Sequence, residues 1–306
     1  MTAAIDSPVS RPMTFEPLDT QSVHDVGRLL LTCEDQPGIC AAVCGHLYRA
    51  GANITNLQQH TTDPHGGWLF LRVEFLLEQV LDRQPEISEA IASLAEQYDM
   101  TWRLSCAANT KRIAIMVSKA DHALQELLWR RESGDLHADI ALVISNHDDL
   151  RHLAETRGIP FHHIPITADT KAEAEQQQLE LIRGNVDTIV LARYMQVLSP
   201  KFLAEFPMQA INIHHSFLPA FVGADPYARA AQRGVKLIGA TAHYVTEEVD
   251  AGPIIEQDVT RIDHRHSVAD LRRRGRYVER AVLARAVAWH VEDRVVVHGN
   301  QTIVFM

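Results

Sequence analysis

Two patterns of hydrophobic and polar positions meet near residue 108. Before it, four strand-like apolar segments and two helical segments follow in the order strand, helix, strand, strand, helix, strand. The turn sequence DPHGG between the two middle strands predicts a hairpin. This order is typical of a ferredoxin-like βαββαβ sandwich, with two helices on one face of an antiparallel sheet. The expected strands are 27–34, 53–62, 67–76 and 100–106, and the expected helices are 37–51 and 84–99.

After residue 108, apolar strands and amphipathic helices largely alternate, with short loops between them. This pattern predicts a doubly wound, mostly parallel sheet with helices on both faces. Ligands of such sheets bind beyond the carboxyl ends of the strands. The expected strands are 111–119, 138–146, 159–166, 187–194, 209–216, 236–246 and 253–260, the expected helices are 121–134, 148–158, 171–184, 199–206, 225–234 and 270–290, and a hairpin is expected at 294–305.

Length and composition support an α/β protein of two domains. A chain of 306 residues exceeds the usual size of a single core. A hydrophobic content of 46% with 22% charged residues is typical of a folded globular chain. We expect a flexible tail at 1–24, a ferredoxin-like domain at 25–108 and a larger α/β domain at 109–306.

Charge and hydropathy exclude two classes of partner. The net charge of −10 argues against nucleic acid, because non-specific affinity for phosphates needs an excess of cations. No stretch approaches the roughly 20 apolar residues that span a bilayer, and the first residues lack the apolar core of a signal peptide. We therefore expect a cytoplasmic protein that acts on a small molecule.

Four cysteines raise the question of a metal site. Cys40 and Cys44 share one face of a helix at i, i+4, with His46 nearby, so a zinc site is conceivable. The spacing matches neither a zinc ribbon nor a zinc finger, and single cysteines are commonly buried. The sequence favours reduced core thiols at Cys33, Cys40, Cys44 and Cys106, and no metal site is expected.

The first loop of the larger domain, MVSKADH at 116–122, has no glycines. It matches neither a dinucleotide-binding loop nor a Walker phosphate loop. Ser118 could still donate a hydrogen bond to a ligand. A nucleotide or sugar phosphate is nevertheless disfavoured there, because glycines allow the backbone to approach phosphate closely.

The segment INIHHSFLP offers the strongest candidate chemistry. Asn212 and His214 are two residues apart on an expected strand, so both side chains project to the same face. An amide beside an imidazole can stabilise an oxyanion, and a nearby carboxylate can hold a water or relay a proton. Asp250, in the loop EEVDAGP, is the best carboxylate candidate. Taken singly, a strand-end amide, a core histidine and a turn-forming Asp are the more ordinary interpretations.

Three motifs together resemble the formyltransferase family that handles 10-formyltetrahydrofolate. They are INIHHSFLP, HYVTEEVDAGPIIEQ and LARYMQVLSP. The resemblance implies that Asn212, His214 and Asp250 are the catalytic trio. It also implies that the loops after two strands bind the folate, through Met195, Val197, Leu198, Val245, Glu248 and Val249.

The first domain resembles an ACT domain in the segment CEDQPGICAAVCGHLYRAGANITNLQQ. From spacing alone, DQPGI reads as an ordinary turn before a helix more readily than as a ligand site. The resemblance favours a regulatory module that binds an amino-acid effector between two copies. It implies effector contacts at Asp35, Gly38, Ile39 and Asn53, and a homo-oligomer, either a dimer or a tetramer.

An ACT domain joined to this catalytic domain resembles the formyltetrahydrofolate deformylases. The resemblance implies hydrolysis of 10-formyltetrahydrofolate to formate and tetrahydrofolate, with water as the acceptor and no cofactor. It further implies formate supply for purine synthesis and balance of the one-carbon pool. The chain departs from the transferases at two positions. His215 replaces a common proline, and Asp225 stands where asparagine or lysine is common, so no direct ligand contact is expected from Asp225.

Alternatives to a hydrolase stay open. One is a formyltransferase that uses 10-formyltetrahydrofolate as donor, and another is a sensor of amino acids or folate without turnover. Neither a phosphate-binding loop nor a basic tRNA-binding domain is apparent, which argues against two well-known acceptors. Arg272, Arg273, Arg274 and Arg276 spread around more than one helix face, so we expect a solvated helix there rather than an anion site.

Overall fold

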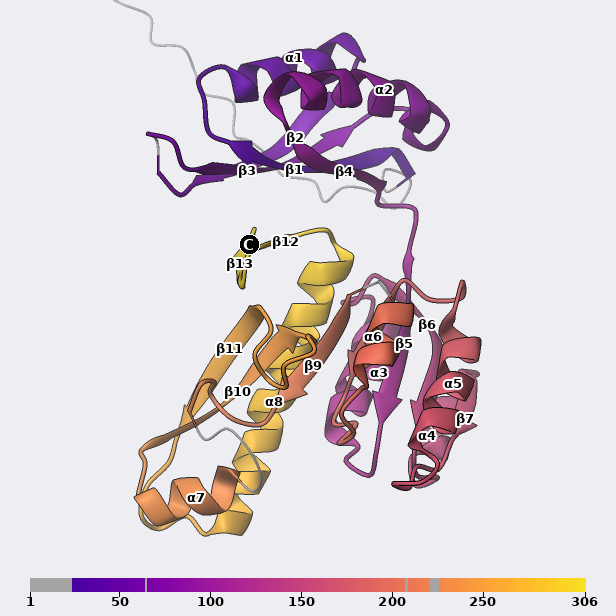
Figure 1. Ribbon diagram of the computed structural model, residues 1–306, viewed down its shortest axis with the longest axis vertical. Helices are drawn as coiled ribbons and strands as arrows, with labels where there is room; N and C mark the ends of the chain where they lie inside the picture. The colour runs from indigo at the N-terminus through magenta and orange to yellow at the C-terminus, as the bar shows by residue number, and fades with distance from the viewer. Residues whose placement is uncertain (1–23, 64, 207–208, 221–225) are drawn as a thin grey trace, which may run out of the picture.

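The first part of the chain folds as a four-stranded antiparallel sheet with two helices on one face (Figure 1). The computed structural model describes residues 24–63, 65–206, 209–220 and 226–306, so nearly all of the expected tail at 1–24 lies outside the described residues. The strand order is β2-β3-β1-β4. The elements are β1 (Val26–Glu34), α1 (Ile39–Arg49), β2 (Asn53–Thr61), β3 (Trp68–Leu76), α2 (Val80–Tyr98) and β4 (Thr101–Cys106). The expected ferredoxin-like sandwich is confirmed.

Alternation along β1 separates the two faces of this sheet. Leu29 and Leu31 join the core beneath α1 and α2. Leu30 points to the opposite face, where it packs with Phe70 and Phe305. The face without helices is therefore apolar as well, and it is covered by the end of the chain.

Helix α2 begins earlier than the sequence pattern predicts. It starts at Val80 instead of residue 84, so Pro85 lies inside it. Proline removes one helical hydrogen bond. Val80 and Ile87 are both buried on the core side, and their packing favours the added turn despite that loss.

The second part is a seven-stranded, mostly parallel sheet of order β11-β10-β9-β8-β5-β6-β7. The strands from β5 to β9 run parallel, and β10 and β11 are antiparallel to their neighbours. The strands are β5 (Lys111–Val117), β6 (Ala138–Ser145), β7 (Phe161–His163), β8 (Thr188–Leu191), β9 (Ala210–His214), β10 (Leu237–Tyr244) and β11 (Ile254–Arg261). The helices are α3 (His122–Ser133), α4 (Arg151–Glu155), α5 (Lys171–Ile182), α6 (Pro200–Glu205), α7 (Pro226–Arg233) and α8 (Val268–Val291).

Helices cover both faces of this sheet, as expected. Along β5, Ile113 and Ile115 pack into one core with residues of α3 and α8, whereas Ala114 and Met116 pack into another with residues of α5 and α6. This alternation is the pattern of a strand that is buried on both faces. The doubly wound architecture is confirmed, and it places the loops after β8 and β9 at one edge.

The closing hairpin consists of β12 (Val295–His298) and β13 (Gln301–Val304), and it turns at Gly299 and Asn300 as predicted. It lies beneath the sheet of the first part, on the side opposite α1 and α2 (Figure 1). The His298 ring contacts those of Trp68 and Phe70, at centroid distances of 4.8 and 5.2 Å. The C-terminus thus fills the junction between the two sheets.

A buried carboxylate reinforces this junction. Asp293 accepts a hydrogen bond from Ser105 at 2.7 Å and pairs with Arg103 at 2.7 Å and with Lys111. Its backbone oxygen accepts from Nε of the buried Arg72 at 3.1 Å. Side chains of the first part therefore bind Asp293 just after α8, and the charge of this buried carboxylate is paired. None of the helices in the described ranges combines the length and apolarity needed to cross a bilayer.

Candidate active site

Strand β9 carries Asn212 and His214 to its carboxyl end, and the loop between β10 and β11 brings Asp250 to them. His214 Nδ1 lies 3.2 Å from Asp250 Oδ2. All three side chains line a cavity of about 370 Å³. The structure therefore brings together three residues that the sequence places up to 38 positions apart, the separation of Asn212 and Asp250.

His243 is a fourth member of this cluster, and the sequence reasoning missed it. It is the cross-strand partner of Asn212 in the pairing of β9 with β10. Its Nδ1 lies 2.9 Å from the Tyr244 carbonyl, so this nitrogen must be the donor. In the neutral ring Nε2 is then an acceptor, and it lies 3.2 Å from Asn212 Nδ2. The imidazole thereby fixes the orientation of the Asn212 amide.

His214 leaves one ring nitrogen free for a ligand. Its Nε2 is buried and has no hydrogen-bond partner among the described residues. The other nitrogen is held by Asp250, which fixes the ring. A buried polar atom without a partner is costly and is commonly found where a substrate supplies the missing partner. Nε2 therefore marks the position where the reacting oxygen can bind.

Asp250 is held as a carboxylate in a strained turn. Its φ of 59° lies in the left-handed region. Hydrogen bonding to His214 holds the pKa of Asp250 well below its usual range despite partial burial. Asp250 is therefore ionised at neutral pH. It can accept a proton from a reacting group, but it holds that proton only briefly.

Gly252 allows this loop to lie against β10. A Cβ atom there would lie 1.9 Å from the Tyr244 backbone oxygen. The same contact region contains a hydrogen bond from Tyr244 N to Pro253 O at 2.9 Å. Any larger residue would push the loop, and with it Asp250, away from His214.

Five of the six predicted folate contacts line the same cavity, namely Met195, Val197, Leu198, Val245 and Val249. Met195, Val197 and Val249 are exposed by 63%, 55% and 55%. Glu248 does not belong to the lining, and its side chain is exposed. An apolar rim beside a polar cluster suits a flat aromatic ligand that carries a reactive polar group.

The first loop of the catalytic sheet is closed by its own hydrogen bonds. Ser118 Oγ lies within hydrogen-bond distance of two acceptors, Asn146 Oδ1 at 2.6 Å and the Tyr194 carbonyl, and its single hydrogen is shared between them. Both side chains are buried. Ser118 is thus engaged within the protein rather than available to a ligand.

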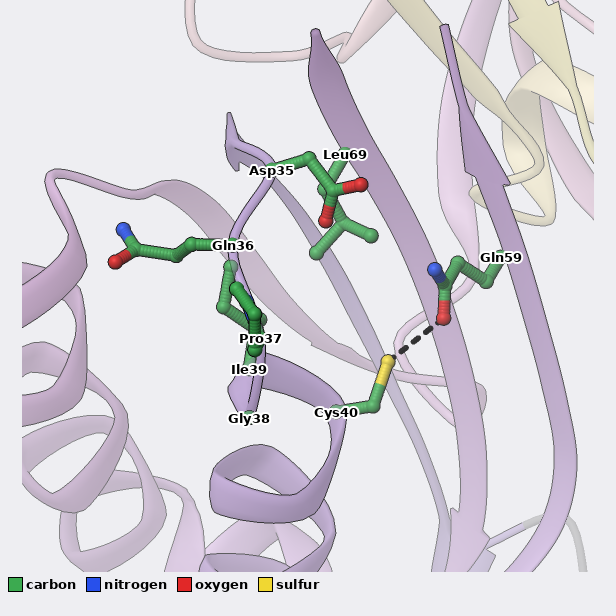
Figure 2. A pocket seen from close by; sticks show the side chains of 8 residues that line it. All are labelled: Asp35, Gln36, Pro37, Gly38, Ile39, Cys40, Gln59 and Leu69. Carbon is green, nitrogen blue, oxygen red and sulfur yellow. Dashed lines mark hydrogen bonds between the residues drawn. The ribbon is translucent and has the colours of Figure 1, made fainter. Parts of the chain in front are cut away.

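A second candidate site lies in the first part of the chain, in a pocket of about 310 Å³. Asp35, Gly38 and Ile39 line it as predicted, but Asn53 does not. Figure 2 shows Cys40 on α1 reaching toward Gln59 on β2, and Cys40 Sγ donates a hydrogen bond to Gln59 Oε1 at 2.8 Å. The pocket is thus formed by the loop after β1, the start of α1 and the neighbouring strands.

The cysteines of the chain are free thiols. Burial, followed by the nearby Cys44, raises the pKa of Cys40, so its thiol is protonated at neutral pH. In the part of the chain that the structure describes, no three His, Cys, Asp or Glu side chains are grouped to hold a metal ion.

Two remaining expectations concern charged residues. Arg272, Arg273, Arg274 and Arg276 are all exposed on α8, as expected for side chains on a solvated helix face. Asp225 lies outside the described residues.

The catalytic part matches a family model described as "Formyl transferase" over residues 111–287, and the first part matches one described as "ACT domain" over residues 27–95. A curated protein named formyltetrahydrofolate deformylase from Bacillus subtilis (strain 168) is 56% identical over 283 residues, which cover 92% of this chain and 94% of the relative. One of the same name from Mycobacterium tuberculosis (strain ATCC 25618 / H37Rv) is 57% identical over 282 residues, covering 92% and 91%.

Solved structures agree with this assignment. A crystal structure of a formyltetrahydrofolate deformylase from Pseudomonas syringae pv. tomato str. DC3000 superposes with a TM-score of 0.88 at 47% identity, covering 92% of this chain and 94% of that one. A glycinamide ribonucleotide transformylase from Symbiobacterium toebii has a TM-score of 0.61 at 32% identity, covering 64% and 95%. Because identity exceeds one half along nearly the whole chain and both parts match, the chain belongs to the formyltetrahydrofolate deformylase family.

Proposed function

We propose that this chain hydrolyses 10-formyltetrahydrofolate to formate and tetrahydrofolate, with water as the formyl acceptor. The names of its relatives support the substrate and the reaction. The observation that carries the proposal is the buried, unpartnered Nε2 of His214, which lies in a cavity beside the oriented amide of Asn212.

The formyl group is an amide, so its oxygen gains negative charge when water attacks the carbon. Asn212 Nδ2 and the imidazolium form of His214 donate hydrogen bonds to that oxygen. Asp250 holds the attacking water and accepts its proton. The C–N10 bond then breaks, N10 takes a proton from the His214 imidazolium, formate leaves, and the proton on Asp250 returns to His214. These steps use only side chains and water, so the proposal includes no cofactor.

The pterin ring occupies the apolar side of the cavity in this proposal. Met195, Val197 and Val249 present apolar surface at the rim, and Leu198 and Val245 lie deeper. Burial of such surface by a flat ring is favourable at roughly 25 cal/mol per Å². Glu248 is left out of the proposed contacts, because its side chain does not line the cavity.

A formyltransferase is the competing function, and the first loop argues against it. Transfer to a phosphorylated acceptor needs groups that bind the phosphate. Ser118 and Asn146 are instead hydrogen-bonded to each other, and the loop has no glycines. Hydrolysis needs no phosphate-binding groups, because its acceptor is water.

Formate release without an added acceptor tests this function. The purified chain is expected to release formate in proportion to 10-formyltetrahydrofolate consumed, and Asn212→Ala is expected to lower kcat about a hundredfold or more through loss of one oxyanion donor. Asn185→Ala is the control, because Asn185 is exposed and lies outside the cavity. Formate that appears only after an acceptor is added would identify a transferase. No turnover at all would identify a sensor, and full activity of Asn212→Ala would refute the assigned role.

The ACT domain is proposed to bind an amino acid in the pocket of Asp35, Gly38 and Ile39, in a homo-oligomer of two or four chains. The free N–H groups at the start of α1 suit a carboxylate, and Asp35 suits an amine. We further propose a domain boundary near residue 108, a cytoplasmic location, and a role in supplying formate for purine synthesis and balancing the one-carbon pool.

Thermal unfolding with each common amino acid in turn tests the effector site. At least one amino acid is expected to raise the Tm of the wild-type protein, because binding to the folded state alone stabilises it. Asp35→Ala is expected to lose this shift. Asn53→Ala is the matched control and is expected to keep it, because Asn53 lies outside the pocket. An equal loss in both variants would contradict the proposed position.

A further inference from the structure

A second cavity, of about 390 Å³, adjoins the catalytic one. Its walls come from the loop after β9, from α7 and from β10 and β11, and they are mainly apolar, with Phe217, Tyr227 and Ile238 among them. In the described part of the chain, His215 is the one residue that lines both cavities. Its side chain thus forms the partition between the formyl site and an apolar chamber.

His215 is wedged between two rings. Its centroid lies 5.3 Å from that of His214 and 5.9 Å from that of Tyr227. Tyr227 is held in turn, because its hydroxyl donates to Glu279 Oε1 at 2.6 Å. At Gly275 a Cβ atom would lie 1.9 Å from that hydroxyl, so glycine is needed for this position of the ring.

Glu279 holds the Tyr227 ring, which packs in turn against His215. It is 1% exposed, lies 2.8 Å from His122 Nε2 and pairs with Arg193 at 3.4 Å. Burial would raise the pKa of Glu279, but the hydrogen bond from His122 and the charge of Arg193 lower it to about 2. Glu279 is therefore ionised at neutral pH, and Arg193 compensates its charge.

The ring of His215 is uncharged at neutral pH. Burial, and next the nearby Arg193 guanidinium, lowers the pKa of His215 to about 4. A neutral imidazole beside an apolar chamber contributes bulk to the site rather than a positive charge.

We propose that His215 determines the acceptor: its ring closes the passage to the neighbouring chamber, so that water reaches the formyl carbon and a larger amine does not. This inference rests on the proposed hydrolase function and concerns only the choice of nucleophile. Asn212, His214 and Asp250 would stabilise the same tetrahedral centre with either nucleophile. Removing the ring would join the chamber to the formyl site and make room for an apolar amine.

Aniline is a suitable probe of this passage. It is uncharged at neutral pH, it is small enough for the chamber, and N10 of the substrate is itself an aryl amine. Its nitrogen would form a bond to the formyl carbon and lose one proton, while the C–N10 bond breaks and N10 gains one. The products are formanilide and tetrahydrofolate, so atoms and electrons balance without a further reactant.

The experiment supplies 10-formyltetrahydrofolate and aniline to wild-type protein and to His215→Ala, and measures formate and formanilide. Wild-type protein is expected to yield formate with only a small, measurable background of formanilide. His215→Ala is expected to raise the ratio of formanilide to formate by about tenfold or more, the scale set by opening room for a small apolar group. His215→Phe keeps a ring of similar size and is expected to retain the wild-type ratio.

Phe217→Ala is the matched control, because it enlarges the second chamber and leaves the partition intact. A His215→Ala protein that releases formate but makes no more formanilide than wild type overturns the inference, and so does equal formanilide from Phe217→Ala. If His215→Ala does not fold, His215→Val applies the same test with a smaller loss of bulk. Absence of formate from the wild-type protein would refute the proposed function instead.

Discussion

At the residue scale, the orientation of one amide decides whether the site can stabilise an oxyanion. Asn212 presents Nδ2 to His243, whose Nδ1 is committed to the Tyr244 carbonyl. The second hydrogen of the amide nitrogen is then left for the substrate. The same-face spacing of Asn212 and His214 was predictable from the strand pattern, but the imidazole that orients the amide was not singled out. Alternation along the expected strand 236–246, combined with antiparallel pairing, is the signal that could have found it.

His290 predicts how stability depends on pH. It is buried, and its ring nitrogens lie 2.7 Å from Thr188 Oγ1 and 2.9 Å from the Tyr244 hydroxyl. Burial, and next the charge of Lys111, lowers the pKa of His290 to about 3. In the unfolded chain a histidine binds a proton below about pH 6.5. The contribution of neutral His290 to stability is therefore complete above that pH and is lost as the pH falls from about 6.5 to about 3.

Urea unfolding across this range provides the measurement. His290→Phe is expected to reduce the slope of the free energy of unfolding against pH by up to about 1.4 kcal/mol per pH unit, the value for one proton. His152→Ala, which removes an exposed histidine, is the control. Identical slopes in wild-type protein and His290→Phe would contradict the assignment.

At the element scale, the turn between β10 and β11 positions Asp250, and Gly252 sets its closeness to β10. Gly252→Ala is expected to lower the free energy of unfolding by about 1 to 3 kcal/mol through overpacking. Turnover is expected to fall as well, because the displaced loop separates Asp250 from His214. Steady-state kinetics and urea unfolding measure both effects.

Gly45→Ala is the matched control for this change. Gly45 lies inside α1, and a Cβ atom there meets only the Arg49 side chain, at 3.6 Å. Stability should rise by roughly 0.5 to 1 kcal/mol because alanine favours the helix, and kcat should not change. Equal kcat values for Gly252→Ala and wild-type protein would show that the turn does not position Asp250.

The order of elements was predictable because each depends on neighbouring residues. The apolar strand patterns matched β5, β6 and β9, and the hairpin turn at Gly299 was expected. The early start of α2 was not predictable from the sequence. Burial of Val80 against the core is a tertiary contact, and it outweighs the local penalty of Pro85.

At the scale of the whole molecule, the C-terminal hairpin connects the two sheets. Phe305 is 5% exposed and packs against Leu30 and Phe70 of the first sheet. Phe305→Ala is expected to lower the free energy of unfolding by about 3 to 5 kcal/mol. It should also separate the unfolding transitions of the two parts, because their shared core is lost.

Calorimetry of Phe305→Ala beside Met306→Ala tests this connection. Met306 is the adjacent residue with a 79% exposed side chain, and its backbone oxygen accepts from Gln58 at 2.7 Å. Met306→Ala keeps that backbone contact and should unfold as wild type does. A single unshifted transition in Phe305→Ala would mean that the hairpin does not hold the two sheets together.

The sequence by itself determined the two sheet types, the division of the chain into strands and helices, and the shared face of Asn212 and His214. These follow from periods of two and 3.6 residues, which depend on local geometry alone. The identity of the trio already drew on family resemblance, because spacing could not show that Asp250 reaches His214.

Only the tertiary structure decided which distant side chains meet. Strand register places His243 beside Asn212, and loop closure brings Asp250 to 3.2 Å from His214. Packing of α7 and α8 places Tyr227 behind His215, while Glu248 and Asn53 lie outside the pockets proposed for them. Such contacts join residues with no periodic relation along the chain, so they depend on how whole elements pack.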